Sequence, residues 1–172
     1  MKGGRIVAIN PLAETGLVGF QHPQHAMQVL TGRSTHLADL HLPVRINGDV
    51  AVLQGIMKAM LAAEDAAPGT VFDHAFIREH TLGYEAFVAN LRQTDWAVIV
   101  EESGIPHEQI AEAARIVMSS DRLVVAWAMG LTQHKNAVSS IQECMNLLLL
   151  KGAIGRKGAG ALPVRGHSNV QG

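Results

Sequence analysis

The chain has 172 residues, 48% of them hydrophobic, which is enough to bury the core of one domain, alone or with short appendages. Fourteen Lys and Arg side chains against fifteen Asp and Glu side chains leave a net charge of −1, so the composition excludes a global field for gathering nucleic acid or an anionic membrane. A single cysteine, Cys144, excludes an internal disulfide and a C-x-x-C metal site; this favours a reducing compartment, and we expect the cytoplasm.

The first predicted strand is Arg5–Ile9, and Asn10-Pro11 ends it because proline cannot continue a hydrogen-bonded ladder. Residues 13–36 contain scattered glycines and several histidines without a clear period, so we expect a loop with at most one helical turn. His22 and His25 are separated by a proline, and no carboxylate or cysteine completes a ligand set. We therefore expect no metal site in this part of the chain.

A second strand is predicted at Ala38–Val44, and the polar turn that follows leads into a helix with Asp49 as its N-cap. Apolar residues at three- and four-residue spacing give this helix one buried face to about Ala63. They are Val50, Leu53, Ile56, Met57, Met60 and Leu61. Glu64–Thr70 is predicted to be a linker.

Several further helices are predicted between residues 73 and 118. Asp73 caps a helix that continues to His80 and that Gly83 ends, and Tyr84–Leu91 forms another. Asp95–Glu102 adds one or two helical turns. A longer helix at Glu108–Met118 has a stripe of small and branched apolar residues, which we expect to be buried. The stripe consists of Ile110, Ala113, Ala114 and Val117.

Residues 123–136 combine an apolar run with an abrupt change to glycine and polar residues. Leu123–Trp127 is rich in β-branched residues and predicts a strand covered on both faces. A helix that starts near His134 would direct its free N–H groups at an anion, at the edge where α/β sheets bind ligands. Gly130–Asn136 is therefore a candidate ligand-binding loop. The alternative is an ordinary strand-to-helix turn in which a polar residue only caps the next helix.

A long helix is predicted at Ala137–Leu150, with enough apolar positions for burial on nearly all sides. Its longest apolar run, Met145–Leu150 with one polar interruption, is far shorter than the roughly 20 residues that a membrane span needs. Cys144 lies within this helix, where no neighbour in the sequence would activate it. We expect an inert buried thiol rather than a nucleophile.

From Lys151 onwards the sequence is rich in glycine, and Arg156, Lys157 and Arg165 lie among these glycines. Glycine allows backbone N–H groups to approach a phosphate or a carboxylate closely. The spacing matches neither a P-loop nor the standard dinucleotide fingerprint. By composition alone, a flexible linker is the better interpretation.

Two motifs alter that interpretation: WAMGLTQH at Trp127–His134 and PVRGHSNVQG at Pro163–Gly172. They resemble the molybdopterin oxidoreductase family, most closely the formate dehydrogenase-like alpha subunits, and weaker likeness extends over nearly the whole chain. The resemblance implies an α/β domain at residues 1–151, with a mainly parallel sheet flanked by helices in a Rossmann-like three-layer arrangement. Residues 152–172 would form a glycine-rich cofactor and active-site loop that continues into a further segment.

The resemblance also implies that the chain holds part of a bis-molybdopterin guanine dinucleotide cofactor. By matching position, Asn10 and Asp49 would lie at the guanosine end, where a carboxylate can accept hydrogen bonds from the guanine N–H edge. Arg165 would stand beside molybdenum and steer an anionic substrate, with His167 as a second candidate catalytic residue. The residues expected to line the dinucleotide are Gly130, Thr132, Gln133 and His134.

Some positions depart from the family pattern. Asn10-Pro11-Leu12 stands where the family usually has aspartate-proline-arginine, and His167 stands where many formate dehydrogenases have glutamine. Formate is therefore one candidate among small anionic substrates. In the family, the cysteines of the 4Fe-4S cluster and the molybdenum ligand lie on a preceding segment, and a later domain closes over the cofactor.

We therefore expect a middle segment of a molybdopterin-dependent oxidoreductase, inactive in isolation. Its expected partners are the remaining domains of the same enzyme and a small-molecule substrate, without nucleic acid or a membrane span. One alternative is a nucleotide-binding or regulatory α/β module without redox activity. Another is a structural scaffold whose glycine-rich tail is disordered.

Overall fold

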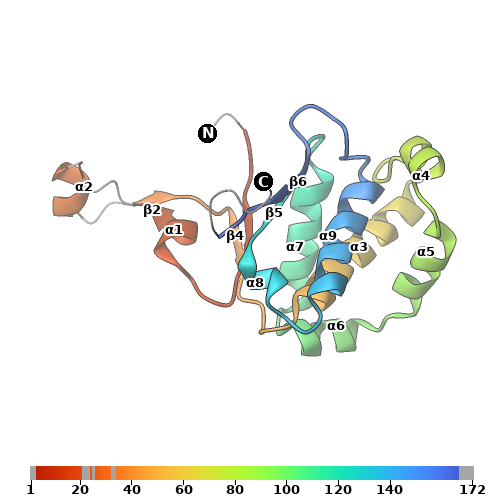
Figure 1. Cartoon of the computed structure of the whole chain (residues 1–172), viewed down its shortest axis with the longest axis horizontal. Helices are drawn as coiled ribbons and strands as arrows, with labels where there is room; N and C mark the ends of the chain where they lie inside the picture. The colour runs from red at the N-terminus through yellow and green to blue at the C-terminus, as the bar shows by residue number, and fades with distance from the viewer. Residues whose placement is uncertain (1–2, 21–23, 25, 32–33, 167–172) are drawn as a thin grey trace.

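The structure is a computed structural model that describes residues 3–20, 24, 26–31 and 34–166. The helices from residue 49 onwards form a packed body on one side of the short paired strands, and the segment at residues 14–36 extends away from this body (Figure 1). The strands are β1 (Val7–Ile9), β2 (Gly19–Phe20), β3 (Thr35–His36), β4 (Leu40–Leu42), β5 (Val124–Trp127) and β6 (Gly160–Pro163). The helices are α1 (Thr15–Val18), α2 (Ala26–Thr31), α3 (Asp49–Ala66), α4 (His74–His80), α5 (Tyr84–Gln93), α6 (Trp96–Ser103), α7 (His107–Met118), α8 (Met129–Thr132) and α9 (Ala137–Leu150).

Helix α3 is the centre of the hydrophobic core and packs against α5, α6, α7 and α9. Its predicted apolar face is confirmed, apart from Val50, which is only half-buried. A Cβ on Gly55 would lie 2.8 Å from Ile99 Cγ2 and 2.9 Å from Ile110 Cγ2, so this glycine lets α6 and α7 approach α3 closely. The fully buried side chains of α3 include Val52, Ile56, Met57 and Met60.

The other helices of the body follow their sequence signals. Asp73 Oδ1 accepts a hydrogen bond from Phe76 N at 3.0 Å and caps α4, and Asp95 caps α6 in the same way. The predicted stripe of α7 is buried. Two boundaries were wrong: α3 continues through Glu64, which is a buried helix residue rather than linker, and Gly83 begins α5 instead of ending α4.

The strands form short parallel pairs, which make the fold mixed α/β. Strand β1 pairs with β4, and β5 pairs with β6, both in parallel, while β2 and β3 form a small antiparallel pair. The expectation that β5 is covered on both faces is wrong, because Val124 is 51% exposed and β6 is its only partner strand within the described residues.

The glycine-rich segment after α9 is not a simple linker. Gly160 N donates to Leu123 O at 2.9 Å, and Val164 N donates to Trp127 O at 2.7 Å, so residues 160–164 run beside β5. Helix α9 starts at Ala137 rather than near His134, because α8 occupies the first part of the predicted loop. The expectation that α9 is buried on nearly all sides is also wrong, since Val138 is 71% exposed.

The segment before β4 has more regular structure than a loop with one helical turn. It contains α1, β2, α2 and β3, none of them longer than six residues. Elements this short lack the repeated apolar spacing on which a sequence prediction depends. His22 and His25, the pair considered as metal ligands, lie outside the described residues.

Candidate functional site

Two turns that lie far apart in the sequence meet beside the start of α3. Asn136 Nδ2 donates a hydrogen bond to Asn47 Oδ1 at 3.2 Å, across a separation of 89 residues. Asn47 has a φ of 69°, a left-handed conformation that asparagine adopts more readily than most residues. The bridge joins the turn that precedes α3 to the turn that precedes α9, and both turns carry predicted cofactor contacts.

The turn before α3 is anchored on the end of α6. Arg45 N donates to Ser103 O at 2.9 Å, and Arg45 Nη1 donates to Glu101 O at 2.5 Å. A Cβ on Gly48 would lie 2.7 Å from Glu102 O, so only glycine fits between the turn and this helix end. The anchor fixes the direction in which the next residue, Asp49, leaves the turn.

Asp49 is a half-buried carboxylate in the first turn of α3. It is not the N-cap that the sequence predicts, because Gly48 occupies that position. Burial raises the pKa of Asp49, while its own backbone N–H and the nearby His134 act to lower it. The structure therefore brings together Asp49 and His134, two of the residues assigned to the cofactor.

The other predicted dinucleotide contacts lie on the exposed surface of α8 and just after it. Gly130 and Thr132 belong to this short helix, and Gln133 is its C-cap. Gln133 Nε2 lies 3.9 Å from Met129 Sδ. A Cβ on Gly130 would have no neighbour within 4 Å, so the space beside this residue is open. The side chains of Thr132 and Gln133 are exposed as well, so a ligand can reach this part of the chain.

Arg165 is exposed and lies just beyond β6. A Cβ on the next residue, Gly166, would be 2.8 Å from Met129 Sδ, so the chain around Arg165 runs against α8. The second candidate catalytic residue, His167, lies outside the described residues. The structure thus places Arg165 beside the helix that carries Gly130 and Thr132.

Asn10 lies at the end of β1, and its backbone completes the pair with β4. Asn10 N donates to Leu42 O at 3.1 Å, and His41 Nε2 lies 3.0 Å from Asn10 O. Its side chain is half-buried. Asn10 directly follows β1, and Asp49 comes after the turn that follows β4, so the two predicted guanosine contacts follow the two strands of one parallel pair. Within the described part of the chain, no hydrogen bond connects them.

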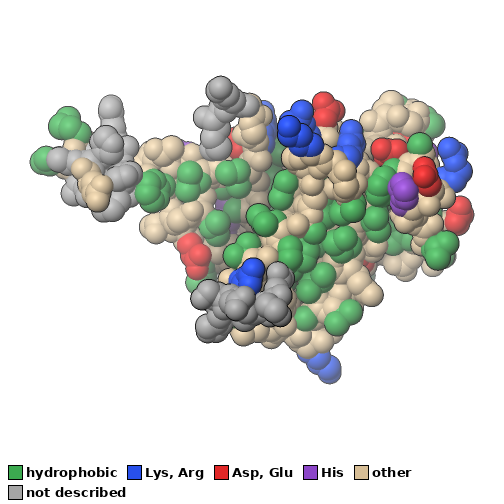
Figure 2. All heavy atoms as spheres, turned by 45° about the horizontal axis from the view of Figure 1, so that its top comes forward, with side chains coloured by type: hydrophobic (Ala, Val, Ile, Leu, Met, Phe, Trp, Pro, Cys, Tyr) green, Lys and Arg blue, Asp and Glu red, His purple; other side chains and the backbone are tan. Residues whose placement is uncertain are grey.

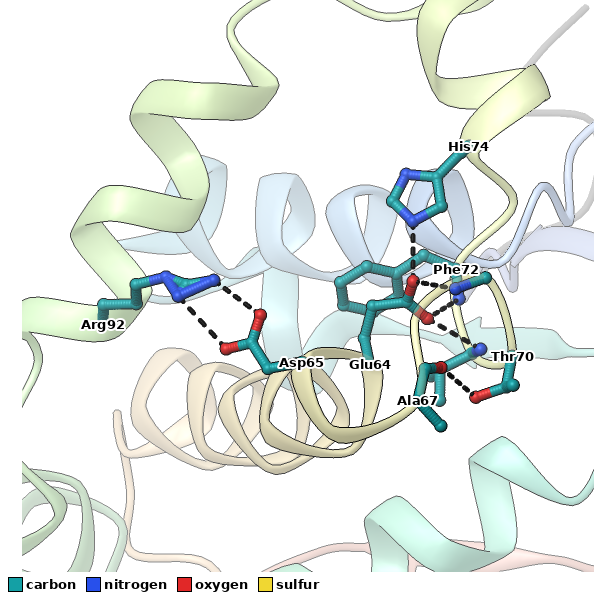
Figure 3. A network of polar contacts seen from close by, with 9 residues as sticks. Glu64, Asp65, Ala67, Thr70, Phe72, His74 and Arg92 are labelled. Carbon is teal, nitrogen blue, oxygen red and sulfur yellow. Dashed lines mark hydrogen bonds and ion pairs between the residues drawn. The ribbon is translucent and has the colours of Figure 1, made fainter.

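A second polar cluster lies at the other end of α3, around Glu64, which is 4% exposed (Figure 3). Its carboxylate accepts hydrogen bonds from the backbone N–H groups of Gly69, Val71 and Phe72, and lies 2.7 Å from His74 Nε2. Burial alone would raise the pKa of Glu64, but these hydrogen bonds hold it at about 2. The sequence pattern does not reveal this role, because Glu64 begins a stretch that is typical of a linker.

Two further observations limit the chemistry of the described residues. Residues 3–20, 24, 26–31 and 34–166 contain no group of three His, Cys, Asp or Glu side chains arranged to hold a metal ion. Cys144 is buried, and burial raises its pKa to about 11, with Asp49 and Glu143 adding to the effect. The expectation that Cys144 is buried is confirmed, and a raised pKa disfavours the reactive thiolate. No helix within those same ranges is both long and apolar enough to cross a membrane.

Comparisons with known proteins give relatives that are much longer than this chain. No protein-family model matches it. It is 42% identical over 170 residues to an uncharacterised oxidoreductase of Mycobacterium tuberculosis, which covers 99% of the chain and 22% of the relative. It is 33% identical over 135 residues to a formate dehydrogenase subunit alpha of Methanococcus maripaludis, covering 78% of the chain and 19% of the relative.

The fold also occurs in a solved structure. Acetylene hydratase from Pelobacter acetylenicus superimposes with a TM-score of 0.70 at 17% identity, covering 91% of this chain and 18% of that one. The chain therefore spans about a fifth of the length of the proteins that it matches. The chain is thus related to a segment of these longer oxidoreductases, in line with its resemblance to the molybdopterin oxidoreductase family and its formate dehydrogenase-like alpha subunits.

Proposed function

We propose that this chain forms one wall of the cofactor site of a molybdopterin-dependent oxidoreductase and binds part of a bis-molybdopterin guanine dinucleotide. The observation that carries the proposal is the bridge between Asn47 and Asn136. It joins the two turns to which the family resemblance assigns cofactor contacts, and it places Asp49 near His134. Relatives named oxidoreductase and formate dehydrogenase support the same reading.

The residues present fit the guanosine end of such a cofactor. A half-buried carboxylate at Asp49 suits the N–H edge of guanine, because a partly desolvated acceptor forms a strong hydrogen bond with it. The open surface beside Gly130 leaves room for a dinucleotide to lie along α8. When bound, the cofactor would supply two-electron redox chemistry at molybdenum, while this chain would hold its guanosine end and exclude water.

Arg165 has a separate role in the proposal. Its planar, permanently charged fork is exposed beside α8, where it would attract and orient a small anionic substrate, formate being one candidate. His167 would assist it. The 4Fe-4S cluster would be bound by another segment of a longer chain, and the enzyme would act in the cytoplasm.

We also infer how the strand pairs are arranged in the complete enzyme. The pairs β1–β4 and β5–β6 would become parts of one parallel sheet in a Rossmann-like three-layer domain at residues 1–151. Residues 152–172 would then form the glycine-rich loop at the active site, beginning directly after α9. The remaining domains would close over this wall and complete the active site, so the isolated chain would not turn over substrate.

The test is Asp49→Asn in the complete enzyme, with molybdenum and guanine nucleotide measured per protein. Loss of the charged acceptor should reduce cofactor retention, because a charged hydrogen bond contributes about 1.5 to 3 kcal/mol. Folding should be unaffected or slightly stabilised, since burial disfavours the charged form of Asp49 and asparagine removes that charge. Asp65→Asn, an exposed carboxylate at the far end of α3, is the matched control. Unchanged cofactor content would remove Asp49 from the guanosine site.

Cofactor content, measured together with kcat/KM, shows whether Arg165 acts on the substrate or on the cofactor. Arg165→Lys keeps the charge but loses the fork, so kcat/KM should fall while cofactor content stays constant. A fall in cofactor content instead would place Arg165 on the cofactor. A guanine nucleotide that is retained without pterin or metal would favour the alternative of a nucleotide-binding module.

A further inference from the structure

A pocket of about 400 Å³ opens at the opposite end of β5 from the proposed cofactor wall. It lies between the turn from α3 to α4, the turn before β5 and the segment after α9. The volume is within the range of small-molecule sites. Its lining residues are Gly69, Thr70, Val71, Phe72, Asp73, His74, Asp121, Lys151 and Arg156.

The wall formed by residues 69–73 is rigid, and its backbone donors are already used. Glu64 accepts from three of these N–H groups. The remaining two are occupied as well: Thr70 N donates to Ala67 O at 3.3 Å, and Asp73 N donates to Leu150 O at 2.9 Å. Residues 69–73 therefore offer a ligand no free backbone donor, and the buried Glu64 keeps this wall in place without a ligand.

The pocket contains two cationic side chains, Lys151 and Arg156. Neither forms an ion pair or a side-chain hydrogen bond with another residue in the part of the chain that the structure describes. Lys151 is half-buried, and burial lowers its pKa; Asp121 acts to raise it, and Arg156 lowers it further. An anion between the two cations would relieve both their mutual repulsion and the burial of Lys151.

The pocket also contains two acidic side chains, Asp73 and Asp121. The carboxylate of Asp73 caps α4 through Oδ1, and a Cβ on Gly152 would lie 2.5 Å from its Oδ2. Both oxygens of Asp73 therefore lie against other parts of the chain. Asp121 remains as the one partial counter-charge to Lys151. The formal charges of Lys151 and Arg156 are balanced by those of Asp73 and Asp121, so the preference for an anion rests on local geometry. Among the described residues the two cations have no ion-pair partner, whereas Asp73 is bound to the start of α4 and His74 Nε2 faces Glu64.

We propose that this pocket binds the phosphate group of a small molecule, with Lys151 as a point charge and Arg156 as a two-pronged donor. Arginine and lysine in this combination suit the several oxygens of a phosphate better than a single carboxylate. The pocket is larger than phosphate alone, so the remainder of the ligand would lie against Thr70, Val71 and His74. This site is independent of the proposed cofactor wall.

The test is equilibrium dialysis of the complete protein with radiolabelled pyrophosphate at physiological ionic strength. The unmodified protein should bind it saturably, and Lys151→Gln and Arg156→Gln should each weaken binding by about tenfold or more. Arg156→Lys should fall between, because it keeps the charge without the fork. Lys157→Gln removes the adjacent exposed cation outside the pocket and should leave binding unchanged within about twofold.

Several results would overturn the assignment. They are the absence of saturable binding, an equal loss in Lys157→Gln, or tighter binding of malonate than of pyrophosphate. Asp49→Asn should leave pyrophosphate binding intact; a loss in that variant would place the ligand on the cofactor wall instead. Thermal melting of each variant shows that reduced binding does not reflect unfolding.

Discussion

At the scale of single residues, Glu64 shows how one buried charge can organise a segment. Three backbone N–H groups and His74, rather than water, are the hydrogen-bond partners of its carboxylate (Figure 3). These contacts fix the turn between α3 and α4. Leaving any of these groups unpaired would cost more than an ordinary surface contact. The folded pKa of about 2, against 4.5 for the free side chain, expresses that stabilisation.

This difference predicts acid sensitivity. A carboxyl group whose pKa is lowered by folding stabilises the fold above its unfolded pKa of 4.5, and the contribution, about 3 kcal/mol, is lost as the pH falls from 4.5 towards 2. Between pH 6 and pH 3 the unmodified chain should lose about 2 kcal/mol more unfolding free energy than Glu64→Gln does. Urea denaturation at the two pH values measures this.

Asp65→Asn is the neighbouring control for the Glu64 experiment. Asp65 pairs with Arg92 at 2.7 Å, but both side chains are about half exposed, so the variant should change the unfolding free energy by less than about 1 kcal/mol. A pH dependence that is identical in the unmodified chain and in Glu64→Gln would show that Glu64 does not carry the acid sensitivity.

The sequence predicts some single residues well and others not at all. The caps at Asp73 and Asp95 follow from local signals, because their partners lie two or three residues ahead. Glu64 could not be recognised, since its partners are backbone groups of a turn beside Pro68-Gly69 that looks like a linker. Asp49 is predicted as the N-cap of α3 but is the first residue of that helix, a shift of one position.

At the scale of elements, the bridge between Asn47 and Asn136 holds the start of α3 against the turn before α9. Because Asn47 has a positive φ, Asn47→Ala should destabilise the chain by about 1 kcal/mol more than Asn47→Gly, as alanine resists the left-handed conformation. Asn136→Ala removes only the hydrogen bond and should cost about 0.5 to 1 kcal/mol. Chemical denaturation of the three variants measures these differences, and equal stability of Asn47→Ala and Asn47→Gly would contradict the role of φ.

The helices and the strands differ in how far sequence predicts them. The helices of the core have apolar faces that repeat over several turns, and α3 and α7 appear where the pattern places them. Strand β6 could not be predicted, because Gly160–Pro163 has no strand pattern and is defined by pairing with β5 some 36 residues earlier (Gly160 with Val124). The same long-range pairing places Arg165 beside α8, so this part of the site became visible only in the structure.

At the scale of the whole molecule, apolar side chains extend over the surface from the strands to the helices (Figure 2). Val124, Leu162 and Val164 on the β5–β6 pair are each about half exposed. Scattered exposed apolar residues are normal, but a run along one strand pair is typical of a contact surface. Under the proposed function, the remaining domains of the longer enzyme would cover this surface.

The contact surface leads to a prediction about accessibility. Leu162→Cys should react rapidly with a thiol reagent in the 172-residue chain and at least about tenfold more slowly in the complete enzyme, where other domains would cover the β5–β6 pair. Site-resolved mass spectrometry measures the two rates. The background from Cys144 should be low, because this thiol is buried with a pKa of about 11.

The matched control for this experiment is Leu82→Cys, on the turn between α4 and α5. Leu82 is fully exposed. The two helices that it connects, α4 and α5, lie on the far side of the body from the strand pairs (Figure 1). It should react at the same rate in both forms, which separates local cover from a general change in reactivity. Equal fast labelling of Leu162→Cys in both forms would mean that the β5–β6 face remains open to solvent in the complete enzyme. The proposed closure of further domains over Arg165 would then have to involve a different surface.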